Sequence, residues 1–178
     1  VQLLGLLDGT LALPNVQLRP SVPNGMHPTR SADVVIAGKI RGYVGEVDPD
    51  VCKAFNIDGR VAWLELDLEA VLNGPHGNRK YSPVSKYPSS DIDLAFEVPD
   101  SITAANIAGA MRKGGGKQLA SVELFDTYRG SGVADGARSL AFRLRFQATD
   151  RTMTDDEIGE LRAGCITAAQ KQKGVKLR

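Results

Sequence analysis

Residues 119–146 read LASVELFDTYRGSGVADGARSLAFRLRF, and this stretch predicts two antiparallel strands joined by a turn. Every second residue in its second half is large and apolar: Leu140, Phe142, Leu144 and Phe146. Such alternation is typical of a strand that buries one face. Residues 130–136 are rich in glycine, which favours a turn. We therefore expect strands over residues 119–128 and 139–147.

The flanking segments complete a βαββαβ order. Residues 92–98 alternate in the same way and predict a strand that precedes this pair. Thr103 can cap a helix that ends at the glycines of residues 114–116, and a capping box at Thr154 starts a second helix. Residues 175–178 can add a last strand. This order predicts an α+β, ferredoxin-like sandwich with both helices on one face of the sheet and the other face open.

The composition changes at residues 73–80, where Gly, Pro and Asn cluster without apolar periodicity. Such a stretch favours a connector between two folded units. We place the boundary between residues 73 and 87, and we divide the chain into residues 1–80 and residues 81–178.

The first unit reads as mostly antiparallel strand. Residues 34–37 and 40–44 flank Gly38 and Lys39 and predict a hairpin with its turn there. Asp48 followed by proline predicts the cap of a short helix over residues 50–55. Residues 61–68 alternate apolar and polar side chains and predict a half-exposed strand. We interpret residues 1–7 as the end of a helix that begins further upstream.

The composition favours a folded, cytoplasmic protein. A hydrophobic share of 42% in 178 residues supports a core and argues against disorder. A membrane helix needs about 20 consecutive apolar residues, and the apolar runs here are much shorter, so we expect no membrane partner. Cys52 and Cys165 lack disulfide-framework or zinc spacing, which favours a reducing compartment. Because Val1 stands in place of an initiator Met, we interpret the chain as a fragment.

The charge is balanced overall but uneven along the chain. The 22 basic and 21 acidic residues give a net charge of +1, which argues against a globally basic nucleic-acid binder. Residues 112–151 nevertheless hold more basic than acidic side chains. A local positive surface and a set of solvated charges are both consistent with this window.

Catalytic motifs are nearly absent. Of the two histidines, His76 lies in the connector and His27 has no nucleophile-elbow motif beside it. A hydrolase that uses His27 is thus a weak alternative, and a structural hydrogen bond is the favoured role for this residue. Residues 114–117 lack the spacing of a phosphate-binding loop. We expect no catalytic residue, cofactor site or metal site in this segment.

The sheet face turned away from the helices is the candidate binding surface. Alternation places Ser139, Ala141, Arg143 and Arg145 on it, and the neighbouring strand adds Ala95. Two arginines two positions apart offer a row of guanidinium donors to phosphates. Ion pairs with Asp93 and Glu97 of the neighbouring strand are an equally good use of them, so an RNA surface and a protein-docking surface both stay open here.

Residues 125–129, FDTYR, add groups that bind unpaired bases. Tyr128 offers a ring for stacking, Asp126 a carboxylate for base N–H groups, and Arg129 a nearby cation for phosphate. Strict alternation would turn Asp126 and Tyr128 towards the helices. They reach a ligand on the open face only if the strand ends or bulges near Phe125.

Several spaced motifs in the second unit resemble one family: YPSSDIDLAF at 87–96, SVELFDTYRG at 121–130, RSLAF at 138–142 and DRTMTD at 150–155. They are similar to the ferredoxin-fold anticodon-binding domain that ends the β chain of bacterial phenylalanyl-tRNA synthetases. The first unit resembles the end of the catalytic-like module of the same chain, through MHPTRSA at 26–32, GYVGEVDP at 42–49 and ELDL at 65–68.

The resemblance implies a role for each unit. The first would belong to a class II synthetase-like module without a working active site that packs against the catalytic α chain. The second would bind the anticodon region of tRNA-Phe. An α2β2 assembly that uses ATP and Mg²⁺ is expected for the parent enzyme, with neither group bound by this segment.

The resemblance also implies site residues. Tyr128 is expected to stack on an anticodon base, Asp126 and Ser139 to bond base edges, and Arg178 to lie near the basic end of the family's domain. Arg129, Arg143 and Arg145 are predicted phosphate contacts. The alternative is a protein-interaction module whose open sheet docks on the rest of its own assembly, with Arg143 and Arg145 paired to protein.

Overall fold

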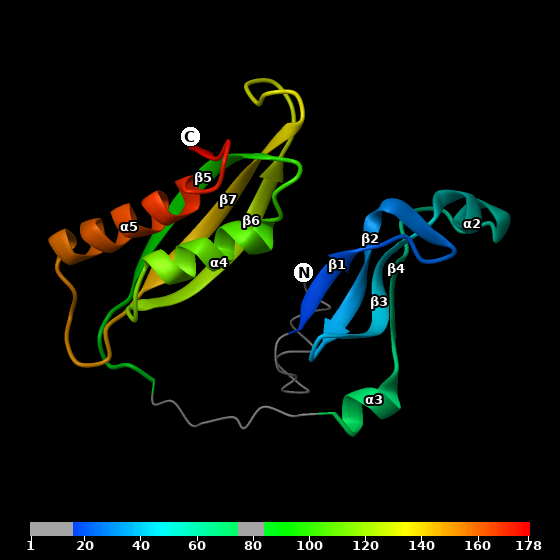
Figure 1. The fold of residues 1–178 in the computed structure, drawn as a ribbon, viewed down its shortest axis with the longest axis horizontal. Helices are drawn as coiled ribbons and strands as arrows, with labels where there is room; N and C mark the ends of the chain where they lie inside the picture. Colours follow the sequence, from blue (N-terminus) through cyan, green and yellow to red (C-terminus); the bar gives the residue numbers. More distant parts are fainter. Residues whose placement is uncertain (1–15, 75–83) are drawn as a thin grey trace. The chain divides into compact units, whose positions relative to one another are not determined.

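A computed structural model describes residues 16–74 and 84–178 of the chain. The chain divides into two compact units, Val1–Ser82 and Pro83–Arg178, and each is described by itself (Figure 1). The predicted helix end at residues 1–7 and His76 lie outside the described residues.

The first unit holds a four-stranded antiparallel sheet in the order β1-β2-β3-β4 and two short helices. Its elements are β1 (Gln17–Pro20), β2 (Met26–Ile36), β3 (Lys39–Val47), α2 (Pro49–Ala54), β4 (Ala62–Leu66) and α3 (Leu68–Leu72). A small core of Val34, Ile36 and Val71 lies on one face of this sheet.

Two local predictions in this unit are confirmed. The hairpin forms as predicted, but its two-residue turn is Ala37 and Gly38, one residue before the predicted position, with φ values of 50° and 77°. Positive φ at both positions is the backbone of the tight hairpin turn that matches strand twist. The Asp48 carboxylate accepts a hydrogen bond from the Asp50 N–H at 2.8 Å and caps α2.

The strand predicted over residues 61–68 is too long at its end. Strand β4 stops at Leu66, and Leu68 begins α3 instead of continuing the alternation. The reason is a helical turn, in which the Asp67 carbonyl accepts the Val71 N–H at 3.0 Å. This turn brings Val71 into the core, where it is buried.

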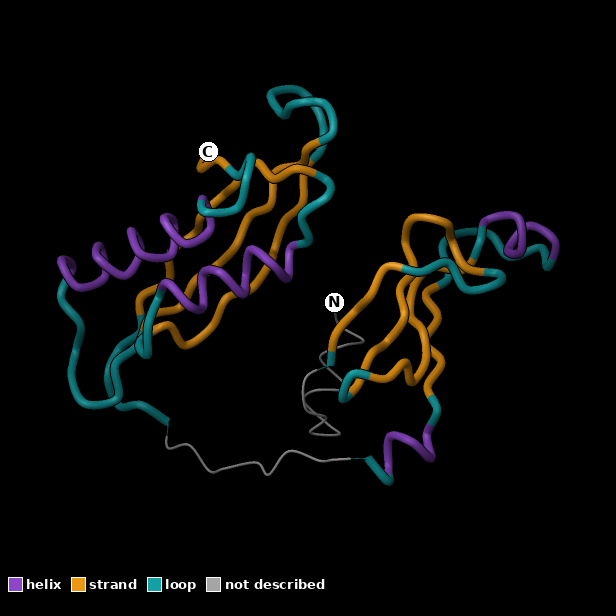
Figure 2. Tube along the Cα trace, in the orientation of Figure 1, coloured by secondary structure: helices purple, strands orange, loops and turns teal. Residues whose placement is uncertain are grey.

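The second unit confirms the ferredoxin-like βαββαβ order. Its elements are β5 (Ser90–Pro99), α4 (Ala104–Gly114), β6 (Leu119–Tyr128), β7 (Ala137–Phe146), α5 (Asp155–Gln170) and β8 (Lys176–Leu177). The sheet order is β6-β7-β5-β8, so β5 and β7 are central. Figure 1 and Figure 2 show α4 and α5 side by side over one face, with the loop after β6 projecting beyond the sheet.

The core of the second unit lies between the helices and the sheet. The inward residues predicted on β7 are all buried there, as are Phe96 on β5, Ile107 and Met111 on α4, and Cys165 on α5. Thr154 completes the predicted capping box with Glu157. Packing against the helices therefore uses one sheet face and leaves the other uncovered by them.

Candidate nucleic-acid interface

Strand β6 contains a bulge at Phe125. Leu124 lies opposite Phe142 of β7, whereas Asp126 lies opposite Ala141, so one residue of β6 has no partner across the strand pair. A bulge of this kind resets the alternation of side chains. Residues directly opposite each other on antiparallel strands project from the same sheet face. Asp126 therefore shares the face of Ala141, away from the helices.

Tyr128 reaches the open face for the same reason. Its partner across the strands is Ser139, and its side chain is 43% exposed. The Tyr128 hydroxyl lies 3.4 Å from the Ser131 hydroxyl, while Asp126 accepts the N–H of Thr127 at 2.8 Å. The sequence pattern allows Asp126 and Tyr128 to contact a ligand on the open face only if the strand ends or bulges near Phe125. The structure has this bulge.

Ser139 lies deeper in this surface. It is 7% exposed, between Tyr128 on one neighbouring strand and Glu97 on the other. Among the described residues its hydroxyl has no hydrogen-bond partner. Ala95 and Ala141, which lie opposite each other, form a floor of small residues beside it. The alternation in the sequence predicts both alanines on this face, and their pairing across the strands confirms it.

The two outward arginines of β7 are paired within the sheet. Arg143 donates two hydrogen bonds to Asp93 at 2.9 and 2.8 Å, and Arg145 donates two to Asp91 at 2.7 Å each. The predicted pair with Asp93 is confirmed, but the predicted pair with Glu97 is wrong because the register places Glu97 opposite Ser139. Hydrogen bonds from the guanidinium groups hold the pKa of Asp91 and of Asp93 below the usual range.

Arg129 is paired as well. It donates to Asp100 at 2.8 Å, and Arg138 donates to the same carboxylate at 2.9 Å. Hydrogen bonds from Arg129 first, and then from Arg138, lower the pKa of Asp100. All three arginines predicted as phosphate contacts thus hold carboxylates in this structure. A phosphate contact by any of them stays a prediction.

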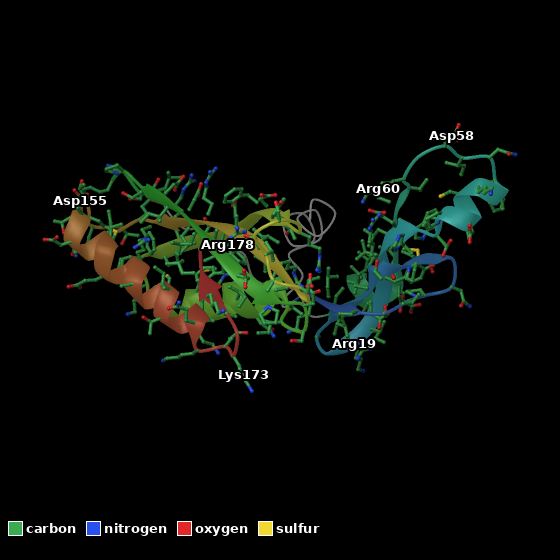
Figure 3. The ribbon with its side chains drawn as sticks, turned by 90° about the horizontal axis from the view of Figure 1, so that it is seen from above. Arg19, Asp58, Arg60, Asp155, Lys173 and Arg178 are labelled. Atoms are coloured by element: carbon green, nitrogen blue, oxygen red, sulfur yellow. The ribbon has the colours of Figure 1, made fainter. Side chains whose placement is uncertain are left out.

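Arg178 differs from these arginines. It follows β8 (Figure 3), and its backbone N–H donates to the Ala95 carbonyl at 2.9 Å. A Cβ added to Gly132 would lie 3.4 Å from Arg178 Nη2, which places the guanidinium against the loop after β6. In the part of the chain that the structure describes, its side chain has no hydrogen-bond or ion-pair partner.

The remaining candidate chemistry is structural. His27 Nδ1 accepts the Thr29 N–H at 3.2 Å, in line with the hydrogen bond favoured for it. Within residues 16–74 and 84–178, no group of three or more His, Cys, Asp or Glu side chains could hold a metal ion. Both cysteines are buried and free, and burial raises the pKa of the Cys165 thiol to about 11. No described helix is long and apolar enough to cross a bilayer.

Two family models match the chain. The ferredoxin-fold anticodon binding domain matches residues 85–178, so the second unit belongs to that class of domain. The model of the phenylalanyl tRNA synthetase beta chain CLM domain matches residues 2–68. The chain therefore belongs to the family of phenylalanine–tRNA ligase β subunits, and both units resemble the modules that its motifs indicated.

Individual relatives agree with this assignment. The phenylalanine–tRNA ligase beta subunit of Lactiplantibacillus plantarum is 37% identical over 86% of this chain and 19% of its own length. The Nocardia farcinica subunit is 37% identical over 92% of this chain and 19% of its own length. For Geobacillus kaustophilus the identity is 33%, over 98% of this chain and 22% of the relative. The chain thus spans about a fifth of the length of the relatives that it matches.

Proposed function

We propose that this chain is the part of a phenylalanine–tRNA ligase β subunit that binds the anticodon region of tRNA-Phe. The observation that carries the proposal is the bulge at Phe125, because it gives Tyr128 and Asp126 the same open face as Ser139. Tyr128 stacks on an unpaired base, while Asp126 accepts from base N–H groups and the Ser139 hydroxyl bonds a base edge. The family assignment supports these roles.

The charges of this surface make stacking and base-edge bonding the main sources of affinity. Arg143 and Arg145 are each neutralised by an aspartate, and Arg129 shares Asp100 with a second arginine. Arg178 is the cation that we assign to the RNA backbone. With few unpaired cations, the affinity depends weakly on salt, since each phosphate neutralised adds about 0.7 to the slope of log affinity against log salt for a single strand.

The ligase reaction belongs to the rest of the assembly. We propose, from the family assignment, that the α chain binds ATP and Mg²⁺ and forms the aminoacyl adenylate. The first unit packs against that α chain within an α2β2 enzyme in the cytoplasm. This segment therefore contributes recognition and assembly, without a catalytic residue.

The alternative function, docking of the open sheet on another protein, is less favoured than RNA binding. It required Arg143 and Arg145 to pair with another protein, and each already donates two hydrogen bonds to an aspartate of its own sheet. The exposed ring of Tyr128 beside an unpartnered serine hydroxyl fits a planar, hydrogen-bonding base better than a flat protein surface.

The proposal is tested by the affinity of the assembled enzyme for a hairpin with the anticodon loop of tRNA-Phe. Tyr128→Leu removes the ring and is expected to cost about 1–3 kcal/mol, the worth of one base–aromatic stack. Tyr128→Phe keeps the ring and is the matched control, with affinity close to that of the wild type. Unchanged affinity for Tyr128→Leu would refute the proposed function.

A further inference from the structure

The bulge residue itself carries a contact that the proposed anticodon site does not use. The Arg143 guanidinium carbon lies 5.1 Å from the centroid of the Phe125 ring, within the range of a cation–π interaction. Phe125 is nevertheless 52% exposed, more than Tyr128. The Phe125 ring therefore contacts one guanidinium group and leaves about half of its surface free for a second planar group.

This pair is held rigidly. Arg143 projects from the central strand β7, and both of its hydrogen bonds to Asp93 come from the fork of the guanidinium, which fixes the plane of the group. Ordering the arginine in advance lowers the conformational entropy that a ligand must remove on binding. Asp93 therefore fixes the orientation of the Arg143 guanidinium.

The side chain at a bulge need not be aromatic for the fold. Phe125 has no partner on β7, and its ring is absent from the buried core of the unit. Phenyl rings and guanidinium planes are the two kinds of protein surface on which unstacked bases lie in RNA complexes. The Phe125–Arg143 pair supplies both at one place.

We propose that Phe125 and Arg143 form a second stacking platform, which takes a base adjacent to the one on Tyr128. The inference rests on the proposed function and adds a subsite to it. Phe125 shares the step opposite Ala141 with Asp126, and Tyr128 lies two steps further on, so the two rings are roughly 7–10 Å apart at about 3.3 Å per residue of strand. Bases that stack on each other are separated by only about 3.4 Å. The two platforms therefore require neighbouring bases that are splayed apart.

The test uses the assembled enzyme and a set of anticodon hairpins, each with the base removed at one loop position. Phe125→Leu keeps an apolar side chain at the bulge but removes the ring, and Phe125→Tyr is the matched control that keeps it. In the intact hairpin, Phe125→Leu is expected to weaken binding about tenfold, within the range of one base stack, and Phe125→Tyr to leave it unchanged.

The decisive result is the loop position at which removal of the base no longer lowers the affinity of each variant. For Phe125→Leu, removal of the base at one position should cause no further loss of affinity. For Tyr128→Leu, the same should hold at a different, neighbouring position. The platform is overturned if Phe125→Leu binds every hairpin as the wild type does, or if both variants lose the same position. If removal of each base lowers the affinity of Tyr128→Leu as much as that of the wild type, the proposed function is refuted instead.

A third variant separates stacking from a phosphate contact. Arg143→Lys keeps the charge but loses the planar fork. The platform predicts a loss of affinity for Arg143→Lys that is insensitive to salt and disappears when the base at the Phe125 position is removed. A loss that appears as a change in salt slope, equally for every hairpin, would assign Arg143 to a phosphate and contradict the platform.

Discussion

Tyr128 of β6 lies directly opposite Ser139 of β7, and the extra residue at Phe125 is what brings these two side chains to the same face. If Phe125 took a regular place in the strand pair, the alternation that buries Val122 would also turn Tyr128 towards the helices. The unpaired place of Phe125 therefore decides which side chains of β6 face a ligand.

Deletion of Phe125 tests this relationship. The deletion removes the residue that has no partner and leaves Leu124 opposite Phe142 and Asp126 opposite Ala141, so Asp126 and Tyr128 keep the open face. We expect a loss of anticodon-hairpin affinity of about tenfold, the same as for Phe125→Leu, because only the Phe125 stack is removed. A folded deletion variant that binds about 100-fold more weakly than the wild type, as if the Tyr128 stack were lost too, would contradict the assignment of Phe125 as the extra residue.

The ion pairs of the open face predict a gain of binding. Asp91→Asn removes the charge that neutralises Arg145, which can then reach a phosphate. The slope of log affinity against log salt should steepen by about 0.7 for this one cation. Asp150→Asn is the matched control, since Asp150 pairs with Arg151 away from the strands of the open face. An unchanged slope for Asp91→Asn would show that Arg145 has no access to RNA.

The close approach of the two helices predicts opposite effects for two glycines of α5. A Cβ at Gly164 would lie 2.6 Å from the Gly114 carbonyl oxygen, so Gly164→Ala should destabilise the second unit by about 1–3 kcal/mol. A Cβ at Gly159 meets nothing within 4 Å, so Gly159→Ala should stabilise it by about 0.5–1 kcal/mol. Denaturant unfolding measures the free energy of unfolding of both variants. Equal changes for the two variants would exclude the close contact between Gly164 and Gly114.

The first unit should lose stability in acid through Glu46. Hydrogen bonds from Arg60 first, and then from Arg30, hold the pKa of this carboxyl at about 2, against 4.5 as its ordinary value. Because the folded state lowers this pKa, the contribution is complete above pH 4.5 and is lost as the pH falls towards 2. Thermal unfolding should show that Glu46→Gln loses less stability than the wild type as the pH falls over this range. An identical pH profile for the variant would contradict the coupling.

Most of the second unit follows from local sequence patterns. The alternation in β7, the cap at Thr103 and the capping box at Thr154 each act over a few residues, and each is present in the structure as predicted. In the first unit, β1 and the turn into α3 were not predicted. Strand β1 has four residues, all exposed, so its pairing with β2 leaves no apolar pattern in the sequence.

The site depends on relationships between strands, and these are harder to predict. Which carboxylate faces Arg145 depends on the register of β5 against β7, which gave Asp91 in place of Glu97. The bulge had a signal, because the apolar positions Val122 and Leu124 are followed by Asp126 where a core residue should come. That break in the pattern permits either a strand end or a bulge, and only the pairing with β7 distinguishes them.

The central claim is that the Tyr128 ring stacks on an anticodon base, and the most direct measurement is the fluorescence of a purine analogue placed in turn at each loop position of the hairpin. If the ring stacks on one base, the emission at that position should change on binding to the assembled enzyme in the wild type and in Tyr128→Phe but not in Tyr128→Leu. The same emission change in Tyr128→Leu as in the wild type at every position would contradict it.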